Sequence, residues 1–351
     1  MVDGIVGEFL ALKEETDADL LAMQCGDFYE FFADDAETVG QELDLKISQK
    51  SSHGSSYPMA GVPLDDLTPY LKVLVERGYR VAVADQHETA SGHARAITRV
   101  ATPGTLLETT DAEARYLAAI AGGADTDAWT GQLRDQQSAT DGAESGPEGP
   151  FGLAFTDVTT GQFAVTTVAT LADARAELYR YDPAEILPGP EVRGDATLEQ
   201  LRDGVDGSLS LHTAESFAPG RARARVTDTF GEGAAAGAGV DSDPALCAAG
   251  AVLDYVAETG LGVTEAMTRL RAYSPTDHVE LDATTQRNLE LVETMRGGDE
   301  GSLVDAIDHT VTSPGGRLLR EWLTRPRRSQ TELTRRHDAV TAVLASPLAR
   351  D

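Results

Sequence analysis

Phe28-Tyr29-Glu30 places an aromatic ring and a carboxylate two residues apart, a pair that can contact a nucleobase. An aromatic side chain can stack on the face of a base, and a carboxylate can hydrogen-bond the edge of that base. The triplet directly follows an apolar run from Leu20 to Cys25. Such pairs are common, and an isolated one more often supplies a core ring and a favourable charge in the first turn of a helix.

Two further motifs follow the triplet along the chain. The first is Tyr57-Pro58-Met59-Ala60-Gly61-Val62-Pro63, and the second is Arg99-Val100-Ala101-Thr102-Pro103-Gly104-Thr105. Proline fixes φ and glycine permits unusual φ values. We therefore expect Pro58, Gly61 and Pro63 to shape the backbone rather than to contact a ligand.

Basic residues near these motifs are candidates for nucleic-acid backbone contacts. Lys50 precedes a polar loop, and Arg95 and Arg99 precede the Thr-Pro-Gly-Thr turn. Contacts to phosphate orient a protein on a duplex without specifying the base sequence. Solvated surface charge is an equally supported interpretation of all three residues.

The periodicity of apolar residues predicts the elements that position these motifs. Leu20 to Cys25 is expected to be a buried strand, and Asp27 is expected to cap a helix that runs to about Leu43. The other expected elements are a helix at 5–15, a strand at 45–48, a polar loop at 51–56, a helix at 67–77, and strands at 79–84 and 97–101. Strands that alternate with helices predict an α/β domain.

The composition is strongly acidic, with 58 Asp and Glu against 29 Lys and Arg and a formal net charge of −29. Lysine is scarce, and this balance resembles that of proteins from salt-loving cells, where acidic surfaces keep proteins soluble. Nucleic-acid binders are usually basic, so the acidity conflicts with DNA binding. Molar salt reduces the conflict because the Debye length there is only ~3 Å. Binding would then depend on stacking, shape and close arginine contacts.

The compartment is expected to be the cytoplasm, with association to the nucleoid. Only Cys25 and Cys247 occur, both in apolar surroundings, which suits a reducing environment without disulfides. No apolar run reaches transmembrane length, and the first residues do not resemble a signal peptide, so no membrane role is expected.

Composition and periodicity divide the chain into five segments. We expect an α/β domain at 1–120, a flexible Gly/Ser/Asp-rich linker at 121–149 and a second α/β domain at 150–230. The Gly/Ala-rich stretch 231–242 is expected to be a joint rather than a phosphate loop, because no Lys or Ser/Thr follows in register. The pattern from 243 to 351 is helical.

The ordered motifs resemble the MutS family of DNA mismatch repair proteins. The three motifs above are similar to its mismatch-recognition domain, and Leu153-Ala154, Asp157, Thr160-Gly161 and Phe163 are similar to a hairpin signature of its connector domain. Leu281 to Leu291, Gly301-Ser302-Leu303 and Gly315 to Leu323 are similar to its helical core. The resemblance implies two α/β domains, the first with a mixed sheet and the second like ribonuclease H, followed by a partial all-helical core.

The resemblance also implies roles for particular residues and partners. Phe28 would wedge into the minor groove and stack on a mispaired base, and Glu30 would hydrogen-bond that base. Lys50, Arg95 and Arg99 would contact the DNA backbone. The implied partner is double-stranded DNA with a mismatch or small loop, together with MutL-like or full-length MutS-like proteins.

The sequence departs from the family pattern in several places. Family members continue into an ATPase with a Gly-x-x-x-x-Gly-Lys-Ser/Thr loop, which does not occur in this sequence. We therefore expect a truncated MutS-like protein that is not itself an enzyme, with no catalytic residue, no metal and no cofactor, since ATP and Mg²⁺ would need the ATPase domain. The loop between Gln86 and Arg95 is also shorter than is usual in the family.

Two alternative functions stay open at this point. The chain could be a non-catalytic module that pairs with full-length MutS or other repair proteins. It could also be a metal-dependent nuclease that uses Asp157, Glu177 and Glu185 of the connector domain, although several acids would have to converge on metal ions. Fold likeness alone does not support that activity. The basic run from Arg317 to Arg328 is more easily explained by helical surface pairing than by DNA contact.

Overall fold

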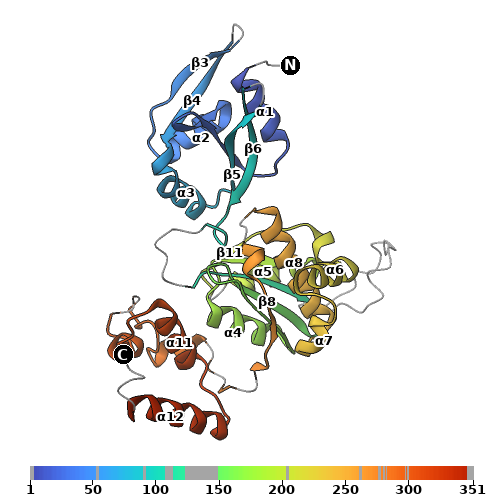
Figure 1. The fold of residues 1–351 in the computed structure, drawn as a ribbon, viewed down its shortest axis with the longest axis vertical. Helices are drawn as coiled ribbons and strands as arrows, with labels where there is room; N and C mark the ends of the chain where they lie inside the picture. Colours follow the sequence, from blue (N-terminus) through green and yellow to red (C-terminus); the bar gives the residue numbers. More distant parts are fainter. Residues whose placement is uncertain are drawn as a thin grey trace.

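A computed structural model describes residues 4–52, 55–89, 92–106, 114–122, 149–202, 205–260, 263–275, 278–279, 281, 283–296, 298 and 300–345. Figure 1 shows three parts along the longest axis: an N-terminal α/β part, a central α/β part and a C-terminal helical part. This architecture confirms the predicted fold class of two mixed α/β sheets followed by helices.

The first part is a six-stranded mixed sheet with helices on both faces. Its strand order is β3-β4-β2-β1-β5-β6, and β1 pairs parallel with β5 while the other neighbours pair antiparallel. One face packs against α2 and α3, and the other packs against α1. The elements are α1 (Ile5–Glu14), β1 (Leu20–Cys25), β2 (Phe28–Phe32), α2 (Ala33–Glu42), β3 (Ser48–Ser52), β4 (Ser55–Pro63), α3 (Leu67–Glu76), β5 (Val81–Thr89) and β6 (Gly92–Ala101).

The prediction that a helix starts directly after Asp27 is wrong. Residues Phe28–Phe32 form strand β2, and helix α2 begins only at Ala33. Tyr29 and Phe31 lie in the core under α2 and α3, whereas Phe32 lies in the core under α1. Such alternation has the period of a strand. Similarly, the predicted polar loop 51–56 is mostly the end of the β3–β4 hairpin, with residues 53–54 outside the described part.

The second part is another six-stranded mixed sheet, in the order β11-β10-β7-β8-β9-β12. Helices α6, α7 and α8 cover one face, and α4 and α5 cover the other. The elements are β7 (Tyr116–Gly122), β8 (Phe151–Asp157), β9 (Gln162–Val168), α4 (Leu171–Tyr181), β10 (Glu185–Pro188), α5 (Asp195–Arg202), β11 (Ser208–Leu209), α6 (Pro219–Phe230), α7 (Ala234–Ala238), α8 (Asp243–Glu258) and β12 (Leu270–Ala272).

Three predicted segment boundaries differ from this sheet. Residues 116–122 form its central strand β7, so the second part begins before the predicted boundary at 120 and before the linker, whose residues 123–148 lie outside the described part. The predicted joint contains α7, whose Ala235 and Ala238 pack on the core. Helix α8, assigned by sequence to the helical segment, is buried on nearly all sides against β7 and β8.

The third part is helical in its described residues, with α9 (Ala283–Asn288), α10 (Leu303–Ile307), α11 (Ser313–Thr324) and α12 (Gln330–Ala345). It contacts the second part through Arg325, whose Nη1 donates to the Tyr181 hydroxyl at 2.9 Å. The Arg325 guanidinium also lies over the rings of Tyr181 and Tyr273, 5.0 Å and 4.4 Å from their centroids. Cation–π contact and a hydrogen bond thus hold the helices on the second sheet.

A buried carboxylate joins the first two parts. Glu185, at the start of β10, is 0% exposed and accepts hydrogen bonds at Oε2 from Thr102 Oγ1 at 2.7 Å and Gly104 N at 2.9 Å. Its Oε1 accepts from Ser210 Oγ at 2.5 Å and the Tyr255 hydroxyl at 2.8 Å. The Thr-Pro-Gly-Thr motif therefore forms a turn that is fastened to the second sheet.

We predict that Glu185→Gln destabilises the protein by about 2–4 kcal/mol, because the amide places an N–H group against donors inside the core. Urea unfolding at constant molar KCl measures the change, with the exposed Glu199→Gln as the matched control. A loss for Glu185→Gln no larger than that of the control would show that the buried carboxylate does not hold the two parts together.

Candidate nucleic-acid interface

Phe28 is the exposed aromatic residue at a tight hairpin turn. Its strand β2 pairs with β1 in the register Cys25↔Phe28, which leaves only Gly26 and Asp27 in the turn. Gly26 has φ 66°, a conformation that glycine adopts without steric cost. The Phe28 side chain is 46% exposed, whereas Phe31 and Phe32 on the same strand are fully buried. The hairpin thus presents one ring to solvent from a fixed backbone.

Glu30 lies on the same face of β2 as Phe28, two residues further along the strand. Gly61 on β4 is its pairing partner, and a Cβ placed on Gly61 would contact Glu30 Cγ at 3.7 Å and Phe28 Cδ1 at 3.9 Å. The bare glycine therefore leaves the surface beside the ring and the carboxylate uncovered. The structure brings together the aromatic and acidic groups that the sequence analysis selected.

The Glu30 carboxylate has a cation nearby but an unsatisfied oxygen. Lys50 Nζ lies 3.9 Å from Glu30 Oε2, an ion-pair distance longer than a hydrogen bond. In the described part of the chain, that oxygen has no hydrogen-bond partner although the side chain is only 14% exposed. A sheltered acceptor without a donor is costly, so a donor supplied by a ligand would be stabilising here.

Cys25 is a neighbour of this site that the sequence analysis did not select as functional. Burial raises the pKa of the Cys25 thiol to about 12, and the negative charge of Glu30 adds to the rise. The thiol therefore stays protonated at neutral pH. Recognising β2 as a strand would have revealed this proximity, because Cys25 on β1 pairs with Phe28, which lies two residues before Glu30 on the same face of β2.

The three predicted backbone contacts occupy different positions. Lys50 on β3 lies beside Glu30 and is 40% exposed. Arg95 lies on the same sheet face, but its guanidinium donates to Glu8 Oε2 at 2.7 Å, Gln24 O at 2.5 Å and Gln86 Oε1 at 2.9 Å.

Arg99 pairs with Val83, a core residue of the opposite face, which is covered by α2 and α3. The structure thus places Lys50 with Phe28 and Glu30, but not Arg99.

The three acids considered for a nuclease are engaged in separate structural roles. Asp157 accepts hydrogen bonds from Thr159 and Thr160 in the β8–β9 turn. Glu177 accepts from the Tyr273 hydroxyl at 2.6 Å, and Glu185 belongs to the buried junction described above. Within the described residues, no three His, Cys, Asp or Glu side chains gather where they could hold a metal ion. None of the helices described is long and apolar enough to span a membrane.

Family models match the chain in three consecutive blocks. The model of MutS domain I matches residues 3–110, that of MutS domain II matches 142–268, and that of MutS domain III matches 284–351. The second block ends at residue 268, just before β12, and the third block begins at residue 284, within α9.

Curated relatives are similar along almost the whole chain. The DNA mismatch repair protein MutS 1 of Haloarcula marismortui is 60% identical over 99% of this chain, and that of Halobacterium salinarum is 56% identical over 99%. The MutS protein of Thermosynechococcus vestitus is 35% identical over 97%. The chain spans only 36%, 38% and 39% of the lengths of these relatives. The first two of these relatives come from halophilic archaea, which agrees with the acidic composition of this chain.

We predict that Glu30→Gln accelerates alkylation of Cys25 by iodoacetamide at pH 8. Removing the carboxylate charge lowers the pKa of the thiol and increases the thiolate fraction. Peptide mass spectrometry follows the rate at Cys25, with the buried Cys247 of the same sample as the internal control. An unchanged ratio of the Cys25 and Cys247 rates would contradict the electrostatic coupling between Cys25 and Glu30.

Proposed function

Because the chain belongs to the MutS family through its match to domains I, II and III, we propose that it binds mismatched or looped duplex DNA through Phe28 and Glu30. The observation that carries the proposal is the exposure of Phe28 at the end of a rigid hairpin, beside a partly unsatisfied Glu30 carboxylate. The relatives from Haloarcula marismortui and Halobacterium salinarum are DNA mismatch repair proteins.

Phe28 acts as the wedge in this proposal. An apolar side chain that enters a base step costs a few kcal/mol of unstacking, and the bent duplex then contacts more protein. A mismatched or looped step is already poorly stacked and more easily deformed, so the wedge enters it at lower cost. Stacking of the ring on a base contributes about 1–3 kcal/mol.

Glu30 acts as the discriminating residue. Its charge repels phosphates, and a donor such as a base N–H would satisfy the oxygen that lacks a hydrogen-bond partner. Binding without a suitable base therefore leaves this oxygen without a hydrogen-bond donor, which weakens binding to paired DNA. Glu30 thus provides selectivity mainly by weakening the complex with paired DNA, rather than by strengthening the complex with mismatched DNA.

Lys50 is the best placed of the proposed backbone contacts because its side chain is 40% exposed and lies beside Glu30. A DNA contact by Arg95 would require its guanidinium to exchange its bonds to Glu8, Gln24 and Gln86. Arg99 would reach DNA only at the opposite face of the sheet. We therefore propose Lys50 as the first phosphate contact and give Arg95 a role in holding the ends of β1 and α1.

A second candidate function is a module that pairs with longer MutS-like or MutL-like proteins. It is favoured by apolar side chains of the third part that face solvent, among them Leu318, Val340 and Leu344 at 45%, 50% and 63% exposure. Large exposed apolar patches commonly mark protein interfaces. Partner binding without any DNA binding would favour this candidate over the first.

We predict that Phe28→Ala weakens binding to a one-base-looped duplex by about 5- to 150-fold, because the stacking energy is lost. Fluorescence anisotropy in molar KCl measures the affinity for the looped duplex and for its homoduplex. Leu211→Ala, which removes an exposed apolar side chain of the second part, is the matched control. Equal affinities of the parent and Phe28→Ala proteins for the loop, with both folded, would exclude the wedge.

We predict that Glu30→Gln strengthens binding to the homoduplex more than binding to a mismatch, so that the ratio of the two affinities falls by at least threefold. The neutral amide removes repulsion from phosphates and can donate as well as accept. The same anisotropy assay gives the ratio, with the exposed Glu199→Gln as control. An increased ratio would mean that Glu30 does not discriminate against paired DNA.

A further inference from the structure

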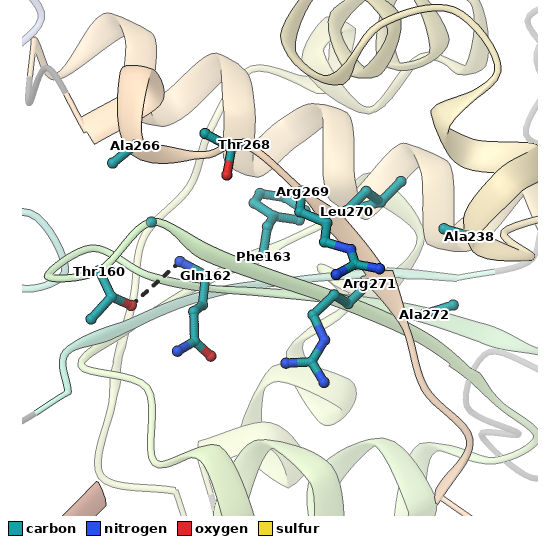
Figure 2. A pocket seen from close by; sticks show the side chains of 11 residues that line it. Thr160, Gln162, Phe163, Ala238, Ala266, Thr268, Arg269, Leu270, Arg271 and Ala272 are labelled. Carbon is teal, nitrogen blue, oxygen red and sulfur yellow. Dashed lines mark hydrogen bonds between the residues drawn. The ribbon is translucent and has the colours of Figure 1, made fainter. Parts of the chain in front are cut away.

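A cavity of about 740 Å³ lies between the second and third parts of the protein. Its lining comes from β7, β8 and β9 of the second sheet, from the end of α4, from the segment that includes β12, and from α11 with its flanking residues. Figure 2 shows two of the lining residues, Arg271 on β12 and Gln162 on β9, beside a smaller hollow of about 550 Å³ that they also line. Small-molecule sites commonly have volumes of about 300–1,000 Å³.

Arg325, the residue that follows α11, lines this cavity and is 9% exposed. Its Nη1 donates to the Tyr181 hydroxyl, but its Nε and Nη2 have no hydrogen-bond partner. These two nitrogens form the edge of the guanidinium group from which two N–H bonds point in parallel. Such an edge binds two oxygens of a carboxylate or a phosphate at once. Because buried donors without acceptors are costly, an oxyanion in the cavity would be stabilising here.

A second buried guanidinium group lies next to the first. Arg180, near the end of α4, lines the cavity with a side chain that is 9% exposed. It lies over the rings of Tyr181 and Tyr273, 5.9 Å and 5.8 Å from their centroids, and Arg325 lies over the same two rings. Arg180 Nη2 forms an ion pair with Glu177, but its Nε has no hydrogen-bond partner. Within the described residues, no acid forms an ion pair with Arg325.

The electrostatics of His278 show that positive charge dominates at this end of the cavity. His278 is 4% exposed, and its Nδ1 has no hydrogen-bond partner. Burial lowers the pKa of His278 to about 4, and the charges of Arg325, Arg327 and Arg180 contribute to the fall. The imidazole is therefore neutral at pH 7 and can give an N–H group to an anion without adding charge.

Acidic residues also line the cavity, and three of the five lie together. The whole chain has 58 acids and 29 bases, whereas the described lining has six arginines and five acids. Burial and the charges of Asp206 and Glu293 raise the pKa of Asp182, and the charge of Arg320 acts in the opposite direction. These three acids thus form a group beside Arg320.

The other two acids of the described lining leave the parallel edge of Arg325 open. Asp308 accepts hydrogen bonds from Thr310 N at 2.8 Å and Thr310 Oγ1 at 2.7 Å. Glu321 lies one helical turn before Arg325 and is exposed, and its backbone carbonyl accepts from Arg325 N at 3.0 Å. The acids therefore reduce the net charge of the cavity without satisfying the buried donors.

We propose that this cavity binds a phosphate group, which accepts hydrogen bonds from the parallel edge of Arg325, from Arg180 Nε and from His278. A phosphate has more than two oxygens and can use both arginines and the histidine, whereas a carboxylate has two. The phosphate is either inorganic phosphate or that of a mononucleotide, since the volume admits both. Because Arg180 belongs to the second part and Arg325 to the third, the bound group would fasten these parts together. This site is independent of the proposed mismatch site on the first sheet.

The test is isothermal titration calorimetry of the full chain in molar KCl. Inorganic phosphate, deoxyadenosine monophosphate, deoxyadenosine and acetate are titrated separately. Arg325→Lys keeps the positive charge but removes the parallel edge, and Arg180→Lys gives the same comparison if Arg325→Lys does not fold. Arg271→Gln removes an exposed charge from the lining of the same cavity and is the matched control.

The proposal predicts that phosphate binds the parent protein and raises its unfolding temperature. It also predicts that Arg325→Lys weakens this binding at least tenfold, while Arg271→Gln changes it less than threefold although it removes a full charge. Equal affinities for phosphate and the nucleotide would support the free anion as the ligand. Binding of the nucleotide at least tenfold more tightly would support the mononucleotide.

Several outcomes would overturn the proposal. They are binding of deoxyadenosine as tight as that of its monophosphate, binding of acetate as tight as that of phosphate, equal losses in Arg325→Lys and Arg271→Gln, and no phosphate binding by the folded parent. Asp277 and Glu280, which flank His278 in the sequence, lie outside the described residues. Phosphate binding by Asp277→Asn/Glu280→Gln alone would show that acids of the chain itself satisfy the arginines, which would overturn the proposal as well.

Discussion

The buried Glu185 carboxylate is the interaction on which the arrangement of the first two parts depends. Desolvating a carboxylate costs several kcal/mol, and that cost is offset only when its oxygens accept well-placed hydrogen bonds. Here Thr102 and Gly104 of the first part and Ser210 and Tyr255 of the second supply the donors. The turn that follows β6 can satisfy Glu185 in only one position, so the chain leaves the first sheet along a fixed path.

This fixed path matters for the proposed recognition of DNA because Phe28, the proposed wedge, lies on the first part. Next to the Glu185 junction, Val100 N donates to Thr259 O at 3.0 Å, and Gly260 approaches Thr98 so closely that a Cβ would meet its carbonyl oxygen at 2.3 Å. The last strand of the first sheet is thus held against the end of α8. A DNA duplex seated on Phe28 would therefore have a defined orientation relative to the second sheet.

Local pattern predicted the two α/β parts, but not the long-range pairings within and between them. The sequence placed Phe28 and Glu30 together correctly, yet it assigned them to a helix start because the alternation in β2 spans only five residues. The assignment of α8 to the helical part failed because a helix that is apolar all round does not reveal which core it enters. The partners of Arg95 and Glu185 could not be predicted, since they lie up to 87 and 83 residues away in sequence.

The central claim, that Phe28 stacks on the abnormal base, is tested most directly by photo-cross-linking. A duplex carries 5-iododeoxyuridine either mispaired with dG or paired with dA, and mass spectrometry identifies the cross-linked residue after irradiation in molar KCl. The account predicts a cross-link to Phe28 that forms with the mispaired base and is at least tenfold weaker with the paired one. A cross-link confined to the second or third part, or equal Phe28 cross-linking to both duplexes, would contradict it.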